Sequence, residues 1–139
     1  PGKEPTGLAF DKKNNRLFSA CSGSNQMVVM DAASGRVVAT LPIGQGCDGL
    51  IFIPESKEII TSNGEGTLTV IHQTDADNYS VTSAIQTKKS ARTITYNKAK
   101  RIIYLPAAEV KTEDGKRTIT PGSFRILVVS RMISRVNRP

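Results

Sequence analysis

The residues on which most enzyme and metal chemistry depends are scarce in this sequence of 139 residues, which holds one histidine, two cysteines and no tryptophan. His72 alone cannot form a multi-histidine zinc site, and a Ser-His-Asp triad would have to use that one imidazole. No nucleophile elbow, zinc-protease helix, phosphate loop or dinucleotide glycine motif occurs. The sequence therefore predicts no resident metal and no cofactor.

The two cysteines, Cys21 and Cys47, are too few for a disulfide framework and form no Cys-x-x-Cys pair. We expect both to be small, buried, unpaired side chains. A disulfide between them is the alternative in an oxidising compartment, provided that the fold brings their Cα atoms within about 4.4 to 6.8 Å.

Long apolar runs and a leader segment are also missing. No stretch reaches the roughly 18 apolar residues of a membrane-spanning helix, so no membrane span is expected. The chain begins at Pro1 without a charged and then apolar leader. We expect a mature form or a piece of a longer protein, large enough for one ordinary domain.

Acidic residues are rare in the last third of the chain. Residues 1–87 contain six Lys and Arg against nine Asp and Glu, whereas residues 88–139 contain thirteen against three. The formal net charge of +7 therefore comes from the C-terminal part. Such an excess is typical of proteins that contact nucleic acid or another anionic surface, although scattered surface lysines also produce it.

An internal repeat is the strongest feature that the sequence does contain. The segments Gly7–Phe10, Gly49–Phe52 and Thr93–Tyr96 resemble one another at spacings of 42 and 44 residues. Within each unit, short runs rich in Val, Ile, Thr and aromatic residues are separated by turn residues. Four such strands in about 43 residues is the period of a β-propeller blade.

The predicted fold is all-β, with three four-stranded antiparallel blades of which the last is incomplete, in a partial ring or as part of an assembled ring. The predicted divisions are a blade at 5–46, a blade at 47–90, an incomplete blade at 91–130 and a basic tail at 131–139. In the third unit no fourth strand matches the others, and an insertion, Ala107–Pro121, separates its second and third strands.

The run Asp31–Gly44, followed by Gly49–Phe52, resembles the YVTN-type repeat of bacterial YncE-like β-propellers. The resemblance extends over residues 5 to about 129. It implies membership of a closed seven-bladed ring and a periplasmic or secreted location. Two features depart from the pattern: Cys47-Asp48-Gly49 stands where the repeat often has Pro-x-Gly, and the insertion gives the third blade an individual loop.

Three blades create a closure problem. A ring generally needs at least about four, so the outer faces of the first and third blades would meet water. An apolar sheet face in water favours instability or aggregation. We therefore expect partners to cover these faces, either the remaining blades of a longer chain or a second copy, for example two arcs in a six-bladed ring.

Candidate site residues gather on one rim, here called the upper face, where the loops before the first strand of each blade meet the loops between its second and third strands. Five polar side chains there are the ligand-binding candidates: Asp48, Asn63, Glu65, Arg92 and Glu109. A ligand with carboxylate and hydroxyl groups would suit Arg92 opposite Asp48 and Glu65. Alternatively, Asp48 and Arg92 pair with each other, and Asn63-Gly64 forms a primed hairpin turn.

The functional hypothesis that follows is a non-enzymatic propeller segment that binds or scaffolds through its upper face, with a small molecule or protein as its ligand. One alternative is a lactonase-like hydrolase, which rests on analogy of fold alone. Another is electrostatic binding of nucleic acid through the basic C-terminal third.

Overall fold

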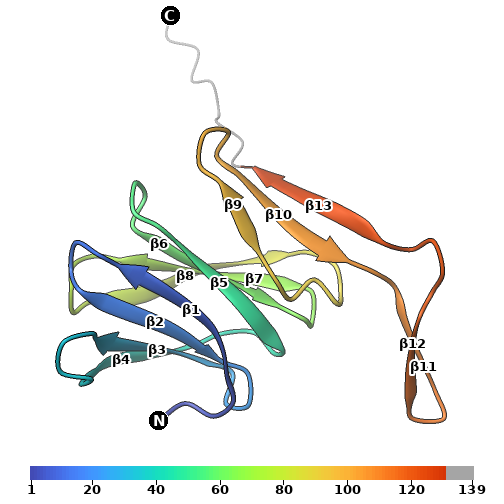
Figure 1. Cartoon of the computed structure of the whole chain (residues 1–139), viewed down its shortest axis with the longest axis horizontal. Helices are drawn as coiled ribbons and strands as arrows, with labels where there is room; N and C mark the ends of the chain where they lie inside the picture. The colour runs from blue at the N-terminus through green and yellow to red at the C-terminus, as the bar shows by residue number, and fades with distance from the viewer. Residues whose placement is uncertain (131–139) are drawn as a thin grey trace, which may run out of the picture.

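The computed structural model describes residues 1–130, which contain strands and turns but no helix. Figure 1 shows three sheets arranged as an open fan, with a small hairpin beyond the third. This arrangement confirms the predicted fold class, antiparallel β-propeller blades in an incomplete ring. The predicted basic tail, 131–139, lies outside the described residues.

The first two blades are four-stranded antiparallel sheets whose strands follow chain order. Blade one consists of β1 (Pro5–Asp11), β2 (Arg16–Cys21), β3 (Gln26–Asp31) and β4 (Val37–Pro42). Blade two consists of β5 (Cys47–Ile53), β6 (Glu58–Asn63), β7 (Thr67–Gln73) and β8 (Tyr79–Gln86). Both sheets therefore have the strand order of a propeller blade.

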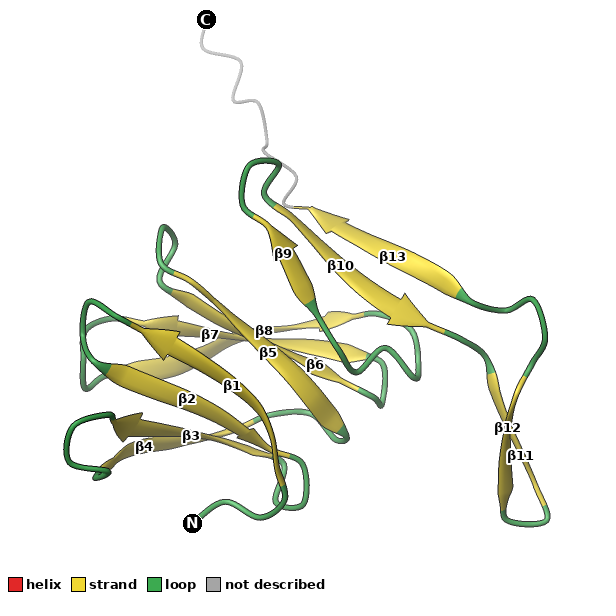
Figure 2. Cartoon of the chain, viewed as in Figure 1, coloured by secondary structure: helices red, strands yellow, loops and turns green. Residues whose placement is uncertain are grey.

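Blade three contains three strands, β9 (Thr95–Asn97), β10 (Ile102–Ala107) and β13 (Arg125–Ser130), in that spatial order. Between β10 and β13 the chain leaves the sheet as a separate hairpin of β11 (Val110–Glu113) and β12 (Lys116–Ile119), which projects away from the blade (Figure 2). The sequence pattern predicts the insertion, Ala107–Pro121, but no strands within it.

The inserted hairpin is closed by a two-residue turn. Asp114 and Gly115 have φ values of 50° and 74°. Positive φ at both central residues is what a type I′ hairpin turn requires, and Asp-Gly is a preferred sequence for it. A sequence signal for the hairpin is therefore present.

One backbone conformation recurs in the turn between the first and second strands of every blade. Asn15, Lys57 and Arg101 have φ values of 55°, 53° and 55°, at the same spacings as the strand repeat. A left-handed conformation costs a non-glycine residue about 1–2 kcal/mol. Its recurrence shows that the repeat fixes the turn geometry as well as the strands.

Glycine brings the innermost strands close together. β1 contacts β5, and β5 contacts β9. A Cβ atom on Gly7 would lie 3.2 Å from the Cα of Gly49, and one on Gly49 would lie 3.2 Å from the Cα of Thr93. The missing side chain therefore lets successive inner backbones approach each other almost to contact.

The first seam, between blades one and two, is filled by aromatic and branched side chains. Phe18 is fully buried, and its ring centroid lies 5.2 Å from that of Phe52 and 5.9 Å from that of Tyr79. Buried aliphatic residues surround this group, including Met27, Val29, Leu50, Ile59 and Ile71. Aromatic pairs in this geometry contribute packing energy beyond the area that they bury.

The second seam, between blades two and three, is mainly aliphatic. Its buried residues are Ile53, Ile60, Leu68, Val70, Ala91, Ile103, Leu105 and Ala107. Tyr96 packs at the margin of this cluster and is only partly buried. The second seam is therefore held by dispersion and burial, without the aromatic cluster of the first.

Polar groups close the first seam on the lower face, the rim opposite the upper face. Arg16 is buried, and its guanidinium donates hydrogen bonds to Asp31 (2.6 Å), to Asp77 (2.9 Å) and to the carbonyl oxygen of Ala76 (2.9 Å). One side chain of blade one is thereby tied to two groups of blade two.

A second polar link lies on the same rim. The side-chain amide of Gln73 donates to the buried carboxylate of Asp11 at 2.9 Å. Burial alone would raise the pKa of Asp11, but hydrogen bonds from Gln73, Asn14 and the backbone outweigh it and lower the pKa. Asp11 is therefore a structural carboxylate that is charged at neutral pH.

The outer faces of the end blades carry apolar side chains in contact with solvent. On β1, Leu8 and Phe10 are 68% and 50% exposed, and on β13, Ile126 and Val128 are 49% and 60% exposed. Residues that alternate with them pack into the two seams. Nothing within residues 1–130 covers either outer face.

Cys21 and Cys47 are both buried and form no disulfide, which confirms the expectation from the sequence. Burial raises the pKa of the Cys47 thiol to about 11. The thiol is therefore neutral at pH 7, in contrast to the lowered pKa of a reactive cysteine.

Candidate functional site

Backbone hydrogen bonds connect the upper-face loops of successive blades. Gly64 N–H donates to the carbonyl of Gly46, and Ser90 N–H donates to the carbonyl of Gly64, both at 2.9 Å. The Ser90 hydroxyl then donates to the carbonyl of Ala108 at 2.5 Å and accepts from Ala108 N–H at 3.0 Å. Loops from blades two and three thus form one continuous surface.

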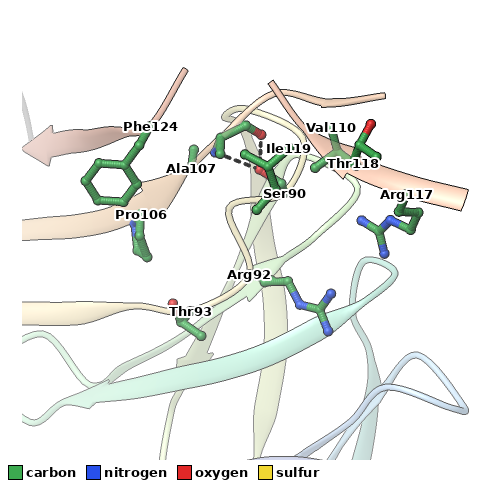
Figure 3. A pocket seen from close by; sticks show the side chains of 11 residues that line it. Ser90, Arg92, Thr93, Pro106, Ala107, Val110, Arg117, Thr118, Ile119 and Phe124 are labelled. Atoms are coloured by element: carbon green, nitrogen blue, oxygen red, sulfur yellow. Dashed lines mark hydrogen bonds between the residues drawn. The ribbon is translucent and has the colours of Figure 1, made fainter. Parts of the chain in front are cut away.

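Two hollows open on this surface beside the inserted hairpin. The first, the apolar hollow, has a volume of about 500 Å³ (Figure 3). Pro106 and Phe124 line it on the side of blade three, Val110 and Ile119 line it from the hairpin, and Arg92 lies at its edge. Most of its lining surface is hydrophobic, and its polar residues come from the segment before β9 (Ser90, Arg92 and Thr93) and from the hairpin (Arg117 and Thr118).

The second, the basic hollow, has a volume of about 640 Å³. It adjoins the apolar hollow along shared residues that include Ser90, Ala108 and Arg117. Five cationic side chains line it: Lys88, Lys89, Lys111, Arg117 and Arg125. Glu109 is the one carboxylate among its lining residues. The site therefore joins a positively charged cleft to an apolar one.

Asp48 and Arg92 lie together at the inner rim. The guanidinium Nε of Arg92 donates to the Asp48 carboxylate, and the backbone N–H of Asp48 donates to the carbonyl of Arg92 at 3.0 Å. The side chain of Asp48 is 26% exposed and that of Arg92 is 46% exposed. The alternative in which the two residues pair with each other is therefore what the structure shows, while Arg92 still borders the apolar hollow.

Asn63 has a structural role that the sequence analysis misplaces. It is the fully buried last residue of β6, and its amide nitrogen donates to the hydroxyls of Thr67 and Thr69, both at 3.0 Å. Its side-chain oxygen accepts from Thr61 at 3.0 Å. The expected Asn-Gly primed turn is wrong, because the positive φ falls on Gly66, at 104°.

The two glutamates among the candidates lie apart. The carboxylate of Glu65 accepts a hydrogen bond from the Thr67 hydroxyl at 2.8 Å, and Glu65 lines neither hollow. Glu109 lines the basic hollow and pairs with Arg125 at 3.1 Å. Of the five predicted residues, the structure thus places Arg92 and Glu109 at the hollows.

The described residues offer neither a metal cluster nor a membrane-spanning helix. Within residues 1–130, no group of three or more His, Cys, Asp or Glu is placed to hold a metal ion. His72 lies in β7 and lines neither hollow. No helix suited to crossing a bilayer occurs in this range.

The cations of the basic hollow are the functional candidates that residue-by-residue reasoning missed. The excess of positive charge after residue 88 is visible in the sequence. It does not show that Lys88 and Lys89, which follow β8, face Lys111 and Arg117, which lie on the inserted hairpin. The Asp114-Gly115 turn is the signal that would have located the hairpin.

Comparison with known proteins identifies the fold class. The sequence matches no protein-family profile and no curated protein sequence. The fold is similar to a chain in the crystal structure of the mitotic checkpoint complex, with TM-score 0.66 and 21% identity, over 74% of this chain and 33% of the other.

The fold is also similar to two proteins provisionally named 6-phosphogluconolactonases. For the Bacteroides uniformis protein the TM-score is 0.64 and the identity 12%, over 90% of this chain and 43% of the other. For the Bacteroides fragilis protein the TM-score is 0.65 and the identity 11%, over 94% of this chain and 43% of the other.

These similar structures are β-propeller proteins, and the chain spans about a third to two fifths of their length. At identities this low, the likeness concerns the fold. The chain is therefore an arc of β-propeller blades with a two-part hollow on its upper face. Its particular function has to be argued from the hollow.

Proposed function

We propose that this chain is a binding segment of a β-propeller that recognises its ligand through the two adjoining hollows on the upper face, without catalysing a reaction. The observation that carries the proposal is the convergence of loops from two blades and the inserted hairpin on one surface. Propeller proteins place recognition surfaces where such loops converge.

The chemistry of the lining supports binding over catalysis. The two hollows are lined by cationic, hydroxyl-bearing and apolar side chains, and their one carboxylate, Glu109, is paired with Arg125. General acid–base or nucleophilic catalysis uses a base placed beside a nucleophile. The lining offers charge and shape, which are the requirements of recognition.

A metabolite panel followed by hydrogen–deuterium exchange tests this proposal. A ligand should protect Lys88–Arg92 and Ala107–Lys111. The variant Ala108→Phe, which fills the wall shared by the hollows, should abolish that protection. Ala33→Phe, on an exposed turn of the lower face, is the matched control and should leave it intact. Protection confined to the lower face would overturn the proposal.

A lactonase-like hydrolase is the second candidate. Two solved structures with this fold carry a provisional 6-phosphogluconolactonase name, and their coverage of this chain is extensive. Assay of a lactone and ester panel with the Arg92→Ala, Asp48→Asn and Glu65→Gln variants separates the two candidates. Turnover that disappears with Arg92→Ala would replace the binding proposal, and no turnover on any member of the panel would remove this one.

The apolar outer faces support a scaffold role. We propose that further blades cover Leu8 and Phe10 on one end and Ile126 and Val128 on the other, supplied by a second copy or by the rest of a longer chain. Light scattering of the chain should show association that Leu8→Lys reduces. Val81→Lys, on an exposed position of β8, is the control. A stable monomer at all concentrations would exclude the second copy.

We also propose that the chain belongs to the YVTN-type, YncE-like group of β-propellers. The structure explains why the YVTN-like run has Asp and Gly at its turn. The Asp31 carboxylate accepts hydrogen bonds from the N–H groups of Ala33 and Ser34, and Gly35 has a φ of 71°. The implied periplasmic or secreted location is tested by fractionating cells that express the protein. Recovery from the cytoplasm alone would contradict it.

A further inference from the structure

The basic hollow combines positive charge with few negative partners. Among residues 1–130, Arg125 is paired with Glu109, whereas Lys88, Lys89, Lys111 and Arg117 have no ion pair. Outside the hollow, Arg16, Arg92 and Lys98 are the described cations that form ion pairs, and the other lysines and arginines are spread over several turns and strands. Unmatched like charges around a concave surface raise its electrostatic potential and attract anions.

A hydroxyl group in the same hollow also lacks a partner. Thr120, which follows β12, lines the basic hollow, and its side-chain oxygen is buried without a hydrogen-bond partner among the described residues. Leaving a buried hydroxyl unbonded is costly. An oxygen-rich ligand in the hollow would supply an acceptor for this hydroxyl and would offset the charge of the cations.

The combination of arginine and lysine favours phosphate. Arginine binds phosphate oxygens in a planar two-point geometry, and lysine adds mobile point charges. Lys88 and Lys89 come from the connection after β8, whereas Lys111 and Arg117 come from the inserted hairpin. Cations from two segments thus surround one hollow of about 640 Å³, which is the size of a site for a small molecule.

The adjoining apolar hollow indicates what else the ligand carries. It shares Ser90, Ala108 and Arg117 with the basic hollow, and it exposes the side chains of Phe124 and Ile119. An aromatic or apolar body seated there would cover these two residues and leave the charged group beside the lysines.

From these features we propose that the upper face binds a phosphorylated small molecule with an uncharged aromatic or apolar body, such as a nucleotide. The phosphate group occupies the basic hollow, and the body rests on Phe124 and Ile119 in the apolar hollow. This inference rests on the proposed binding function and specifies the ligand class of that site.

Calorimetric titration with ATP, pyrophosphate and adenosine tests the two halves separately. ATP should bind more tightly than either part alone. Lys88→Gln/Lys89→Gln should weaken ATP and pyrophosphate by about tenfold or more, because two cations are lost from the phosphate site. Phe124→Ala should weaken ATP and adenosine while leaving pyrophosphate unchanged.

The matched control is Lys12→Gln/Lys13→Gln, an adjacent lysine pair in an exposed turn of blade one. It removes the same charge from the lower face and should change ATP affinity by less than about twofold. Equal weakening by both double variants would overturn the inference, because it would show attraction to net charge rather than to a site.

Failure of this inference differs from failure of the proposed function. No binding of ATP or pyrophosphate at about 5 mM, together with protection of the same hollows by an uncharged metabolite, would overturn the phosphate ligand and leave the binding function standing. If a single-stranded oligonucleotide binds but neither ATP nor pyrophosphate does, the ligand is a nucleic acid and the small-molecule proposal is overturned. No ligand of any kind at the hollows would contradict both.

Discussion

The two seams of the arc are held together at different levels of the molecule. In the first, Phe18 packs against two tilted or edge-on aromatic rings, and Arg16 links the two blades on the lower face. In the second, the interior is aliphatic, and the polar links gather at the upper face, around Ser90 and the Asp48–Arg92 pair. The first seam therefore combines aromatic packing with a polar network, and the second seam positions the loops that form the hollows.

The largest expected effect is on the aromatic interior of the first seam. Phe18→Ala should lower the free energy of unfolding by about 3–5 kcal/mol, because it leaves a cavity between the partly buried rings of Phe52 and Tyr79 and the buried aliphatic residues. Urea unfolding followed by circular dichroism measures this loss. A double-mutant cycle with Phe52→Ala should show coupling of about 0.5–1.5 kcal/mol.

The matched change in the second seam is Leu105→Ala, at an equally buried position. It should cost about 2–5 kcal/mol but show no coupling to Phe52. If Phe18→Ala fails to fold, Phe18→Leu gives the same comparison at smaller cost. Coupling of Leu105 to Phe52 would show that the seams are not separate units.

The next largest effect concerns the lower-face network. Arg16→Met should cost about 2–3 kcal/mol, because Asp31, Asp77 and a carbonyl oxygen each lose a charge-assisted hydrogen bond. Thermal unfolding measures the loss. Arg36→Met, at an exposed turn position, is the control and should change stability by less than about 0.5 kcal/mol. Equal effects would mean that the network adds nothing to the first seam.

The inner glycines allow the same change to be made in both seams. Gly7→Ala and Gly49→Ala should each cost about 1–3 kcal/mol, because the new Cβ would lie 3.2 Å from a backbone atom of β5 and of the segment before β9, respectively. Chemical denaturation compares the two. A cost in only one seam would show that the other adapts by separating its inner strands.

Asp11→Asn should lower the free energy of unfolding by about 1 kcal/mol at neutral pH, a smaller effect than those above. The folded pKa of Asp11 is below its ordinary value of 3.8, so its carboxylate stabilises the fold above that pH. The stabilisation is lost as pH falls through the folded pKa. The difference between the two proteins should therefore narrow below pH 3.8, and a difference independent of pH would contradict the assignment.

The smallest effect is expected at the Asp48–Arg92 pair. Arg92→Met should cost less than about 1 kcal/mol, because both side chains are partly exposed to water. About 1 M salt should remove most of that difference. A loss of free energy of unfolding similar to that of Arg16→Met would mean that the ion pair on the upper face stabilises the fold as much as the lower-face network does.

The sequence predicted the fold because the blades are made of local repeats. Strand spacing, turn residues and alternating apolar positions all recur, and each is decided by neighbours along the chain. The buried, unpaired state of Cys21 and Cys47 was also predictable, since small apolar-like side chains at strand ends pack into the core.

The site was only partly predictable. Arg92 and Glu109 were located on the upper face, but Asn63 was assigned to a turn although three threonine hydroxyls hold it inside blade two. The convergence of Lys88 with Arg117 depends on the direction in which the inserted hairpin leaves β10, and no local pattern sets that direction.

Thr93 has a consequence for whatever stands beyond the third blade. At Gly7 and Gly49 the angular step from one blade to the next is set by backbone meeting backbone. Thr93 holds the corresponding place in the third unit and lines the apolar hollow with a branched side chain. A neighbour added by the same rotation would collide with that side chain, so it must sit farther out or tilt. Thr93 thus places a branched side chain where Gly7 and Gly49 leave room for the next inner backbone.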